Sequence, residues 1–285
     1  MIGQNQLTSQ IDDLVKADKF PHFCIIEGAV GSGKKTLVKY IHGAIEYSGL
    51  IWMQNTVDDV RLAISQAYNS GGIQMYVFAD ADNMSMSAQN ALLKVTEEPP
   101  SNTYFILTVS NINNVLETIQ SRANIFHMEP YTQYELNEYL APYDDGFDKK
   151  LALEVCETPG DIDLLYKNGA EKLYNFVEKV MDNIAEVSVA NALKIANSIA
   201  FTDTDEGKFD LALFWKAVIM YYCNEFTADV KNMSVEELRT KARIVMSTKE
   251  CIDMITKTRG INKRNVFDIW ILDVRDILGE EYGSN

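Results

Sequence analysis

A glycine-rich stretch near the start of the chain has the residue types and spacing of a loop that binds phosphate. Residues 28–36 read GAVGSGKKT, so Gly28, Gly33 and Lys34 fit the pattern G-x-x-x-x-G-K. Glycines let such a loop turn tightly and bring backbone N–H groups to the phosphates, and the N-terminus of the following helix adds partial positive charge. Lys34 would supply a point charge to the β- and γ-phosphates. The stretch therefore predicts a nucleotide-phosphate site.

The position after Lys34 departs from this pattern. Ser or Thr is expected there because its hydroxyl ligates Mg²⁺, but the chain has Lys35. Thr36 follows one residue late, about 100° further around the helix, and would point elsewhere. The members of this degenerate loop that we assign to phosphate binding are Gly28, Gly31, Ser32, Gly33, Lys34, Lys35 and Thr36. The sequence leaves open whether ATP or ADP binds there without hydrolysis, or whether the stretch is a glycine-rich turn with no ligand.

A second stretch, residues 77–82 with the sequence VFADAD, also bears on hydrolysis. An active P-loop ATPase needs an Asp at the end of a strand to hold Mg²⁺, and that position is Ala79 here. A methyl group cannot bind a metal. For Asp80 and Asp82 we favour a solvated turn between a strand and a helix, with Asp82 or Ser87 capping that helix. We therefore assign no metal site and expect impaired ATPase chemistry.

The elements that would position these residues alternate between strands and helices in the first part of the chain. Short apolar runs predict buried strands of a parallel sheet at residues 23–26, 75–78 and 104–109. Helical spacing of apolar residues predicts helices at residues 34–45, 57–68 and 87–96. This alternation predicts an α/β layered fold. Residues 1–128 are therefore expected to form one α/β core domain.

The second part of the chain has helical patterns and no strand signals. Short helices are predicted at residues 134–140, 149–157, 162–166 and 173–184. A turn is predicted at 158–160, a polar linker at 202–207, and further helices over 209–278. The last helix begins near Asn262 and carries an apolar stripe of Val266, Ile269, Trp270, Val274 and Ile277. We predict a small helical domain at 129–205 and a second helical domain at 208–285.

Composition and charge limit what the chain can do alone. The 285 residues carry a net charge of −15, and between Glu129 and Asp205 there are 16 Asp and Glu but 6 Lys and Arg. Contacts to DNA phosphates need Lys and Arg, so a DNA function would work through partner proteins. Apolar runs fall short of the ~18 residues that span a membrane, and the N-terminus lacks a signal-peptide pattern, so we expect a cytoplasmic protein. The four cysteines form no C-x-x-C pair, which argues against zinc.

Two further stretches carry a family resemblance. Residues 87–100 read SAQNALLKVTEEPP, and residues 117–122 read ETIQSR. Their order and spacing resemble the clamp-loader family of AAA+ proteins, in which S-A-Q-N-A-L-L-K-x-x-E-E-P-P precedes a strand and T-I-x-S-R-C closes the core domain; Ala123 replaces the final Cys. The motifs cover residues 1 to about 125, and beyond them the resemblance is architectural. It implies an α/β P-loop AAA+ core with a parallel sheet, then a small helical lid domain and an all-helical C-terminal collar domain for oligomerisation.

The resemblance also implies partners and a role for one arginine. Clamp-loader subunits form a pentamer that opens a ring-shaped sliding clamp and places it on primed DNA, with ATP at the subunit interfaces. The Arg of the S-R-C motif reaches a nucleotide held by a neighbouring subunit, and by position it is Arg122, preceded by Ser121. A planar, permanently charged guanidinium is suited to stabilising a transferred phosphoryl group. The alternative is a local ion pair with a carboxylate such as Glu117.

The subunit type follows from further positions. The family places a Glu after the metal-binding Asp and a cis Arg after a Pro-Gly turn, and this chain has Asp80 and Asp161 there. An Asp near a triphosphate would repel it. Together with Lys35 and Ala79, these changes resemble the delta-prime type of subunit of bacterial DNA polymerase III, which keeps only the trans Arg. Many delta-prime proteins carry a zinc module of four Cys that residues 37–75 lack.

Two functions from different classes follow. The leading hypothesis is a non-catalytic clamp-loader subunit whose partners are motor and delta-like subunits, the sliding clamp and, within the assembly, primed DNA. The alternative is an ATP-hydrolysing motor subunit of a clamp loader or a related AAA+ machine, and Lys35, Ala79 and Asp161 argue against it. A P-loop kinase is disfavoured by the Ser121-Arg122 motif and by the helical second half.

Overall fold

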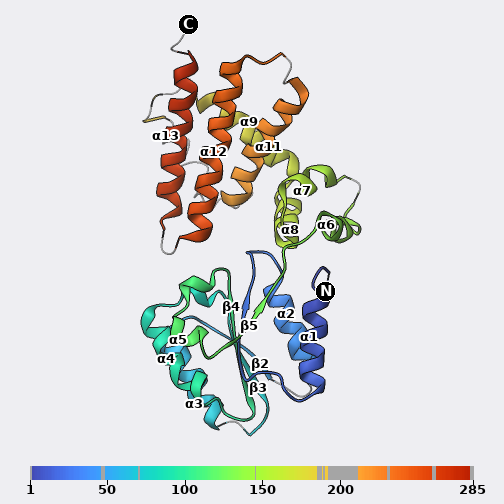
Figure 1. Ribbon diagram of the computed structural model, residues 1–285, viewed down its shortest axis with the longest axis vertical. Helices are drawn as coiled ribbons and strands as arrows, with labels where there is room; N and C mark the ends of the chain where they lie inside the picture. The colour runs from blue at the N-terminus through green and yellow to red at the C-terminus, as the bar shows by residue number, and fades with distance from the viewer. Residues whose placement is uncertain are drawn as a thin grey trace. The chain divides into compact units, whose positions relative to one another are not determined.

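The chain forms two compact units (Figure 1). The computed structural model describes residues 2–45, 49–69, 71–144, 146–184, 188, 190–191, 211–229, 232–258 and 261–282. One unit comprises residues 1–139 with 158–160, and the other comprises 140–157 with 161–285. Each unit is described by itself below. The predicted domain boundaries at 128/129 and 205/208 stay predictions, and the predicted linker at 202–207 lies outside the described residues.

A five-stranded parallel sheet forms the centre of the first unit, in the order β2-β3-β4-β1-β5. The strands are β1 (Phe23–Glu27), β2 (Gly49–Met53), β3 (Gln74–Phe78), β4 (Thr103–Val109) and β5 (Asn124–His127). The three strands predicted from apolar runs are the three central ones, β1, β3 and β4, and they are confirmed. The edge strands β2 and β5 were not predicted, because their residues are only partly buried and give no continuous apolar signal.

Helices cover both faces of this sheet (Figure 1). They are α1 (Asn5–Lys16), α2 (Lys34–Ala44), α3 (Val57–Asn69), α4 (Met86–Glu97) and the short α5 (Glu117–Gln120). Alternate residues of a strand face opposite sides, so Phe23 and Ile25 join a core cluster with α3 and α4. Cys24 and Ile26 join a second cluster with α1 and α2. The predicted α/β fold with a parallel sheet is therefore confirmed.

The start of α4 corrects one expectation. The side chain of Ser85 accepts a hydrogen bond from the N–H of Ala88 and caps the helix. Neither Asp82 nor Ser87 is the cap. Ser85 has the extended backbone that a capping residue needs, and its hydroxyl reaches the third N–H of the helix. The side chain of Asp82 therefore takes no part in the cap of α4.

The regular elements in the described part of the second unit are all helices. Five helices lie wholly within the described part of this unit: α7 (Lys149–Val155), α9 (Ala170–Ile184), α11 (Leu211–Asp229), α12 (Val235–Lys257) and α13 (Lys263–Tyr282). The boundary between the two units falls within two further helices, α6 (Gln133–Leu140) and α8 (Pro159–Asn168). The predicted turn at 158–160 is wrong in part, because Pro159 and Gly160 already belong to α8. Proline suits the first turn of a helix, where its missing N–H has no partner to lose.

The apolar core of the second unit brings α11 and α13 together. Trp215 stands opposite Phe267 and Trp270 with ring centroids 6.0 and 6.1 Å apart, and all three side chains are fully buried. Of the predicted stripe on the last helix, Ile269 is 60% exposed, whereas the other four members are buried. Among the described helices, none is long and apolar enough to cross a membrane.

Candidate functional site

The predicted phosphate loop, residues 28–36, follows β1 and runs into the first turn of α2. Gly31 and Gly33 have φ angles of 78° and 91°, a left-handed conformation that glycine adopts without strain. Gly28 packs so closely that an added Cβ would lie 2.8 Å from the Ser32 hydroxyl and 2.9 Å from the Met128 Cβ. The glycines of this loop are therefore needed for its shape.

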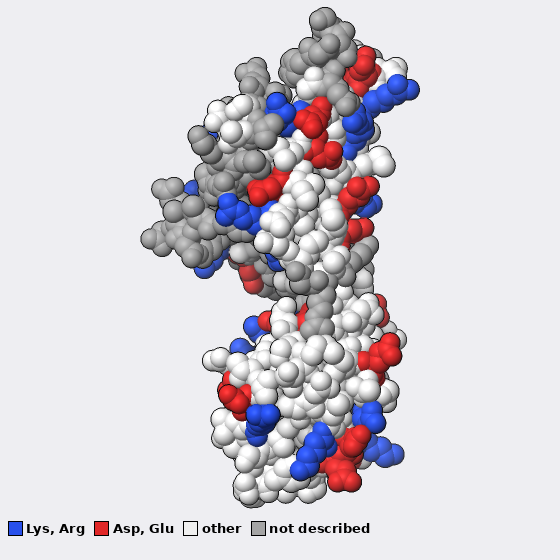
Figure 2. All heavy atoms as spheres, turned by 90° about the vertical axis from the view of Figure 1, so that its left-hand side faces the viewer, with Lys and Arg blue, Asp and Glu red and all other residues white. Residues whose placement is uncertain are grey.

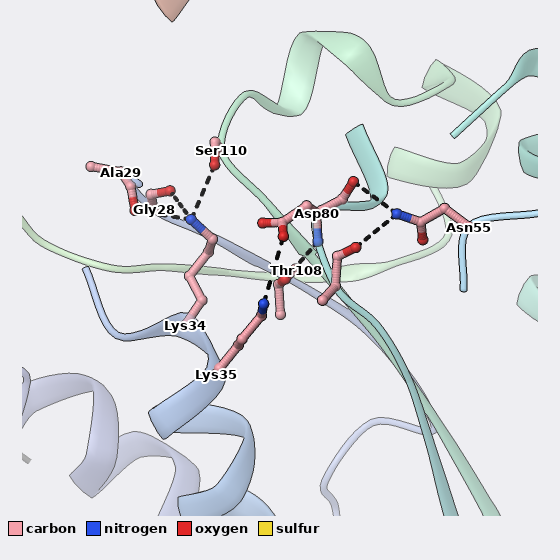
Figure 3. Close-up of polar contacts among 9 residues, drawn as sticks. Gly28, Ala29, Lys34, Lys35, Asn55, Asp80, Thr108 and Ser110 are labelled. Atoms are coloured by element: carbon pink, nitrogen blue, oxygen red, sulfur yellow. Dashed lines mark hydrogen bonds and ion pairs between the residues drawn. The ribbon is translucent and has the colours of Figure 1, made fainter. Parts of the chain in front are cut away.

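The ammonium of Lys34 lies inside the loop (Figure 3). It donates hydrogen bonds to the carbonyl oxygens of Gly28 at 2.7 Å and Ala29 at 2.9 Å, and to the hydroxyl of Ser110 at 3.1 Å. Burial lowers the pKa of Lys34, while the nearby carboxylates of Asp80 and Asp82 act in the opposite direction. The charge of Lys34 is thus held at the point where a phosphate loop uses it.

The carbonyl groups of the loop are held from outside. The hydroxyl of Tyr131 donates to the carbonyl of Ser32 at 2.7 Å, and the N–H of Gly160 donates to the carbonyl of Gly31 at 3.0 Å. An added Cβ at Gly160 would lie 2.5 Å from the Cα of Gly31, so only glycine fits there. The first N–H groups of an α-helix have no acceptor within the helix, so those at the start of α2 are available to an anion.

The end of β3 faces the same loop (Figure 3). Ala79 follows the strand directly, and Asp80 comes next with a φ of 53°, which is unusual for a residue with a side chain. The N–H of Asp80 donates to Thr108, and the amide of Asn55 donates to the carbonyls of Ala79 and Asp80. The ammonium of Lys35 lies 3.8 Å from a carboxylate oxygen of Asp80.

These side chains suit a phosphate group but not Mg²⁺. The metal would need the oxygen ligands that Ser or Thr and Asp provide, and Lys35 and Ala79 offer a cation and a methyl group instead. Among the described residues, no group of three His, Cys, Asp or Glu side chains could hold a metal ion. Thr36, the nearest hydroxyl after Lys34, is exposed on α2. A phosphate fits the loop through its glycines, Lys34 and the N-terminus of α2.

Asp82 has a structural role that the sequence did not indicate. It is buried, and one of its carboxylate oxygens accepts hydrogen bonds from the N–H groups of Ser110 and Asn111, both at 3.2 Å. The interpretation of Asp82 as part of a solvated turn is therefore wrong. The carboxyl ends of β3 and β4 meet at one edge of the sheet, which is where ligands of open α/β sheets bind. The available signal for Ser110 was its place directly after the buried strand β4.

Arg122 lies between α5 and β5 with its side chain 39% exposed. Its guanidinium pairs with the carboxylate of Glu97 at 3.0 Å and donates to the carbonyl of Thr118 at 2.8 Å. Arg122 therefore makes the local ion pair that the alternative predicted, and its partner is Glu97 at the end of α4 in place of Glu117. Ser121 is also exposed, and its hydroxyl donates to the carbonyl of Thr118 at 3.2 Å. These contacts leave three of the five guanidinium N–H donors for another group.

Asp161 makes an ion pair within the second unit. Its carboxylate lies 3.5 Å from the ammonium of Lys216 on α11, which also contacts Glu157 at 3.0 Å. Burial lowers the pKa of Lys216, but the carboxylates of Asp161 and Glu157 outweigh burial and raise it overall. At the position where the family resemblance predicts a cis Arg, this chain therefore has a carboxylate that is paired with a lysine of its own.

Comparison of the sequence with known proteins finds similarity to subunits of DNA polymerase III and of replication factor C. Residues 44–132 match the family described as "DNA polymerase III, delta subunit". Replication factor C small subunit 1 of Pyrobaculum islandicum is 26% identical over 182 residues, which are 59% of this chain and 53% of that protein. Replication factor C subunit 5 of Homo sapiens is 25% identical over 146 residues, 46% of this chain and 43% of that protein. The chain thus spans about half the length of these curated relatives.

Solved structures extend the likeness of fold over most of the chain. A DNA polymerase III gamma subunit-related protein of Thermotoga maritima has a TM-score of 0.50 at 16% identity, covering 94% of this chain and 99% of that one. A RuvB variant, T158V, of the same organism has a TM-score of 0.50 at 12% identity, covering 99% and 88%. The chain therefore has the fold of these AAA+ structures. Its sequence is similar to clamp-loader subunits over part of its length.

Proposed function

We propose that this chain is a non-catalytic subunit of a clamp loader, similar to the delta-prime subunit of bacterial DNA polymerase III. The observation that carries the proposal is the ammonium of Lys35, which lies against Asp80 at 3.8 Å where a hydrolysing site needs a metal ligand. Ala79 removes a second ligand, and Asp161 replaces a cis arginine with a carboxylate. A loop of this kind keeps its shape but lacks the means to position Mg²⁺ for hydrolysis.

In this proposal the chain acts through Arg122, which it supplies to the ATP site of a neighbouring subunit, with Ser121 beside it. A partly exposed guanidinium with unused donors supports that role. The partners are motor and delta-like subunits and the sliding clamp, with primed DNA met only inside the assembly in the cytoplasm. Residues 129–205 would serve as a lid and residues 208–285 as the collar that joins subunits.

We expect the isolated chain to hydrolyse ATP no faster than a blank reaction, because both metal ligands are missing at Lys35 and Ala79. The measurement is steady-state phosphate release by the purified protein with MgCl₂. A Lys34→Ala variant is the matched control, because it removes the main phosphate contact of the loop. Release above the blank that disappears in this variant would contradict the proposal.

A motor subunit that hydrolyses ATP is the second candidate. It is favoured by the left-handed glycines Gly31 and Gly33 and by Lys34, which keep the loop in a phosphate-binding shape. The same assay separates the two functions, since a motor would turn over ATP in a way that depends on Lys34.

We also expect the free chain to show no measurable affinity for duplex DNA at physiological salt. Its net charge is −15, and phosphate contacts need clustered Lys and Arg. On the face shown in Figure 2, the described Lys and Arg side chains lie beside Asp and Glu side chains. The measurement is fluorescence anisotropy of a labelled duplex titrated with the protein at several salt concentrations. Tight binding that weakens steeply with salt would count against this expectation.

A further inference from the structure

The phosphate loop combines features that fit phosphate with features that do not fit its usual metal. We propose that residues 28–36 bind the diphosphate group of a nucleotide without a divalent cation, and that the ammonium of Lys35 supplies the positive charge that Mg²⁺ would supply. This inference deepens the proposed function, because it rests on the same degenerate loop. It concerns binding alone and involves no chemical step.

The anion side of the proposal rests on the geometry of the loop. The left-handed Gly31 and Gly33 shape the turn, and the carbonyls of Gly31 and Ser32 are held by Gly160 and Tyr131. The first N–H groups of α2 have no acceptor within the helix, so they are available to the ligand. Helix α2 runs over eleven residues, so it contributes its dipole to an anion at this end.

The cation side of the proposal rests on Lys35. Its ammonium faces the carboxylate of Asp80 (Figure 3) at 3.8 Å. The two side chains are 62% and 50% exposed. A long, exposed ion pair of this kind is weak, so Lys35 can turn from Asp80 to a phosphate at little cost. An ammonium is a compact charge with three donors and can bond a phosphate oxygen.

Oxygen ligands for a divalent cation are missing at the two positions that hold Mg²⁺ in an intact loop, because Lys35 and Ala79 stand there. The carboxylates of Asp80 and Asp82 lie near the consecutive ammonium groups of Lys34 and Lys35 and offset part of the positive charge at the loop. The charge that Mg²⁺ would bring is supplied by Lys35 at the position of the missing ligand. The loop should therefore bind ADP at least as tightly without Mg²⁺ as with it, which is the reverse of an intact P-loop.

Calorimetric titration of the full chain with ADP, in excess MgCl₂ and separately in EDTA, tests this directly. We expect equal or higher affinity in EDTA. Lys35→Ser should lower the affinity in EDTA about 10- to 100-fold, because a hydrogen bond to a charged group is lost. Lys39→Ser is the matched control, since Lys39 is an exposed lysine on the same helix, and it should change nothing. Inorganic pyrophosphate should compete with ADP, because the contacts fall on the phosphates.

Each other outcome would overturn the proposal. These are absence of ADP binding in both buffers, tighter binding with MgCl₂, an unchanged affinity in Lys35→Ser, or failure of pyrophosphate to compete. Thermal melting of Lys35→Ser beside the wild type checks that the variant folds, and Lys35→Met provides a second variant of similar length without the charge. Failure of this proposal leaves the role of Arg122 standing, because that role is read from ATP hydrolysis by the assembly and needs no nucleotide on this chain.

Discussion

Replacing Arg122 with Ala is expected to slow ATP hydrolysis in a reconstituted clamp loader while leaving this chain folded. An arginine supplied across an interface stabilises charge on the transferred phosphoryl group and is worth about 10³–10⁵ in rate at the site that it completes. Its local pair with Glu97 is a surface pair, with side chains 39% and 57% exposed, and such pairs contribute about 0–1 kcal/mol to stability. The measurement is steady-state ATP turnover of the complete assembly with the sliding clamp and primed DNA.

Two further variants make the Arg122 experiment specific. Arg122→Lys should rescue turnover poorly, because Lys keeps the charge but lacks the planar fork that can contact two phosphate oxygens. Arg61→Ala is the matched control, since Arg61 is a 72% exposed arginine of the same unit that pairs with Asp58, its neighbour on α3. Equal turnover by the Arg122→Ala and Arg61→Ala assemblies would leave this chain a purely structural subunit.

Replacing Trp270 with Ala is expected to destabilise the helical unit by about 3–5 kcal/mol, as large-to-small changes of buried aromatic residues do. Trp270 is fully buried and stacks on Phe267 with centroids 5.6 Å apart. Its indole N–H donates to the buried hydroxyl of Thr248 at 2.9 Å, and that hydroxyl donates to the carbonyl of Ile244 at 2.7 Å. The substitution therefore removes packing and a buried hydrogen bond together.

Ile269 offers an internal control for the Trp270 variant. It precedes Trp270 on α13 but is 60% exposed, so Ile269→Ala should change stability by no more than about 0.5 kcal/mol. The measurement is urea unfolding of the full chain, followed by circular dichroism. Similar losses of stability in the two variants would contradict the burial that the structure assigns to α13.

Strong local patterns account for what the sequence predicted. The central strands β1, β3 and β4 are continuous apolar runs because both of their faces are buried, and α2, α3 and α4 carry apolar residues at helical spacing. The edge strands β2 and β5 pair on one side only, so their sequences carry a weaker signal. The predicted stripe on α13 includes Ile269 because its spacing fits a helix. Periodicity alone does not show whether an apolar residue at such a position is buried or exposed.

The candidate site depends on contacts that no local pattern contains. The sequence identified Lys34 and Arg122 as functional candidates, but the partners of Arg122 come from α4 and α5. Asp82 was interpreted as part of a solvated turn because it lies between a predicted strand and a predicted helix. Its bonds to Ser110 and Asn111 exist only because β3 and β4 lie side by side in the sheet. Contacts of this kind depend on which strands are neighbours in the sheet, and a local sequence pattern does not contain that information.

Single-turnover hydrolysis of labelled ATP by the preassembled complex tests the central claim most directly, because it reports the chemical step and excludes product release. Two assemblies are compared, one with the wild-type chain and one with Arg122→Ala, at equal occupancy of nucleotide, clamp and primed DNA. The proposal predicts that the variant loses the share of fast hydrolysis that belongs to one neighbouring site, while nucleotide binding and assembly are unchanged. The same rate and amplitude in both assemblies would contradict it.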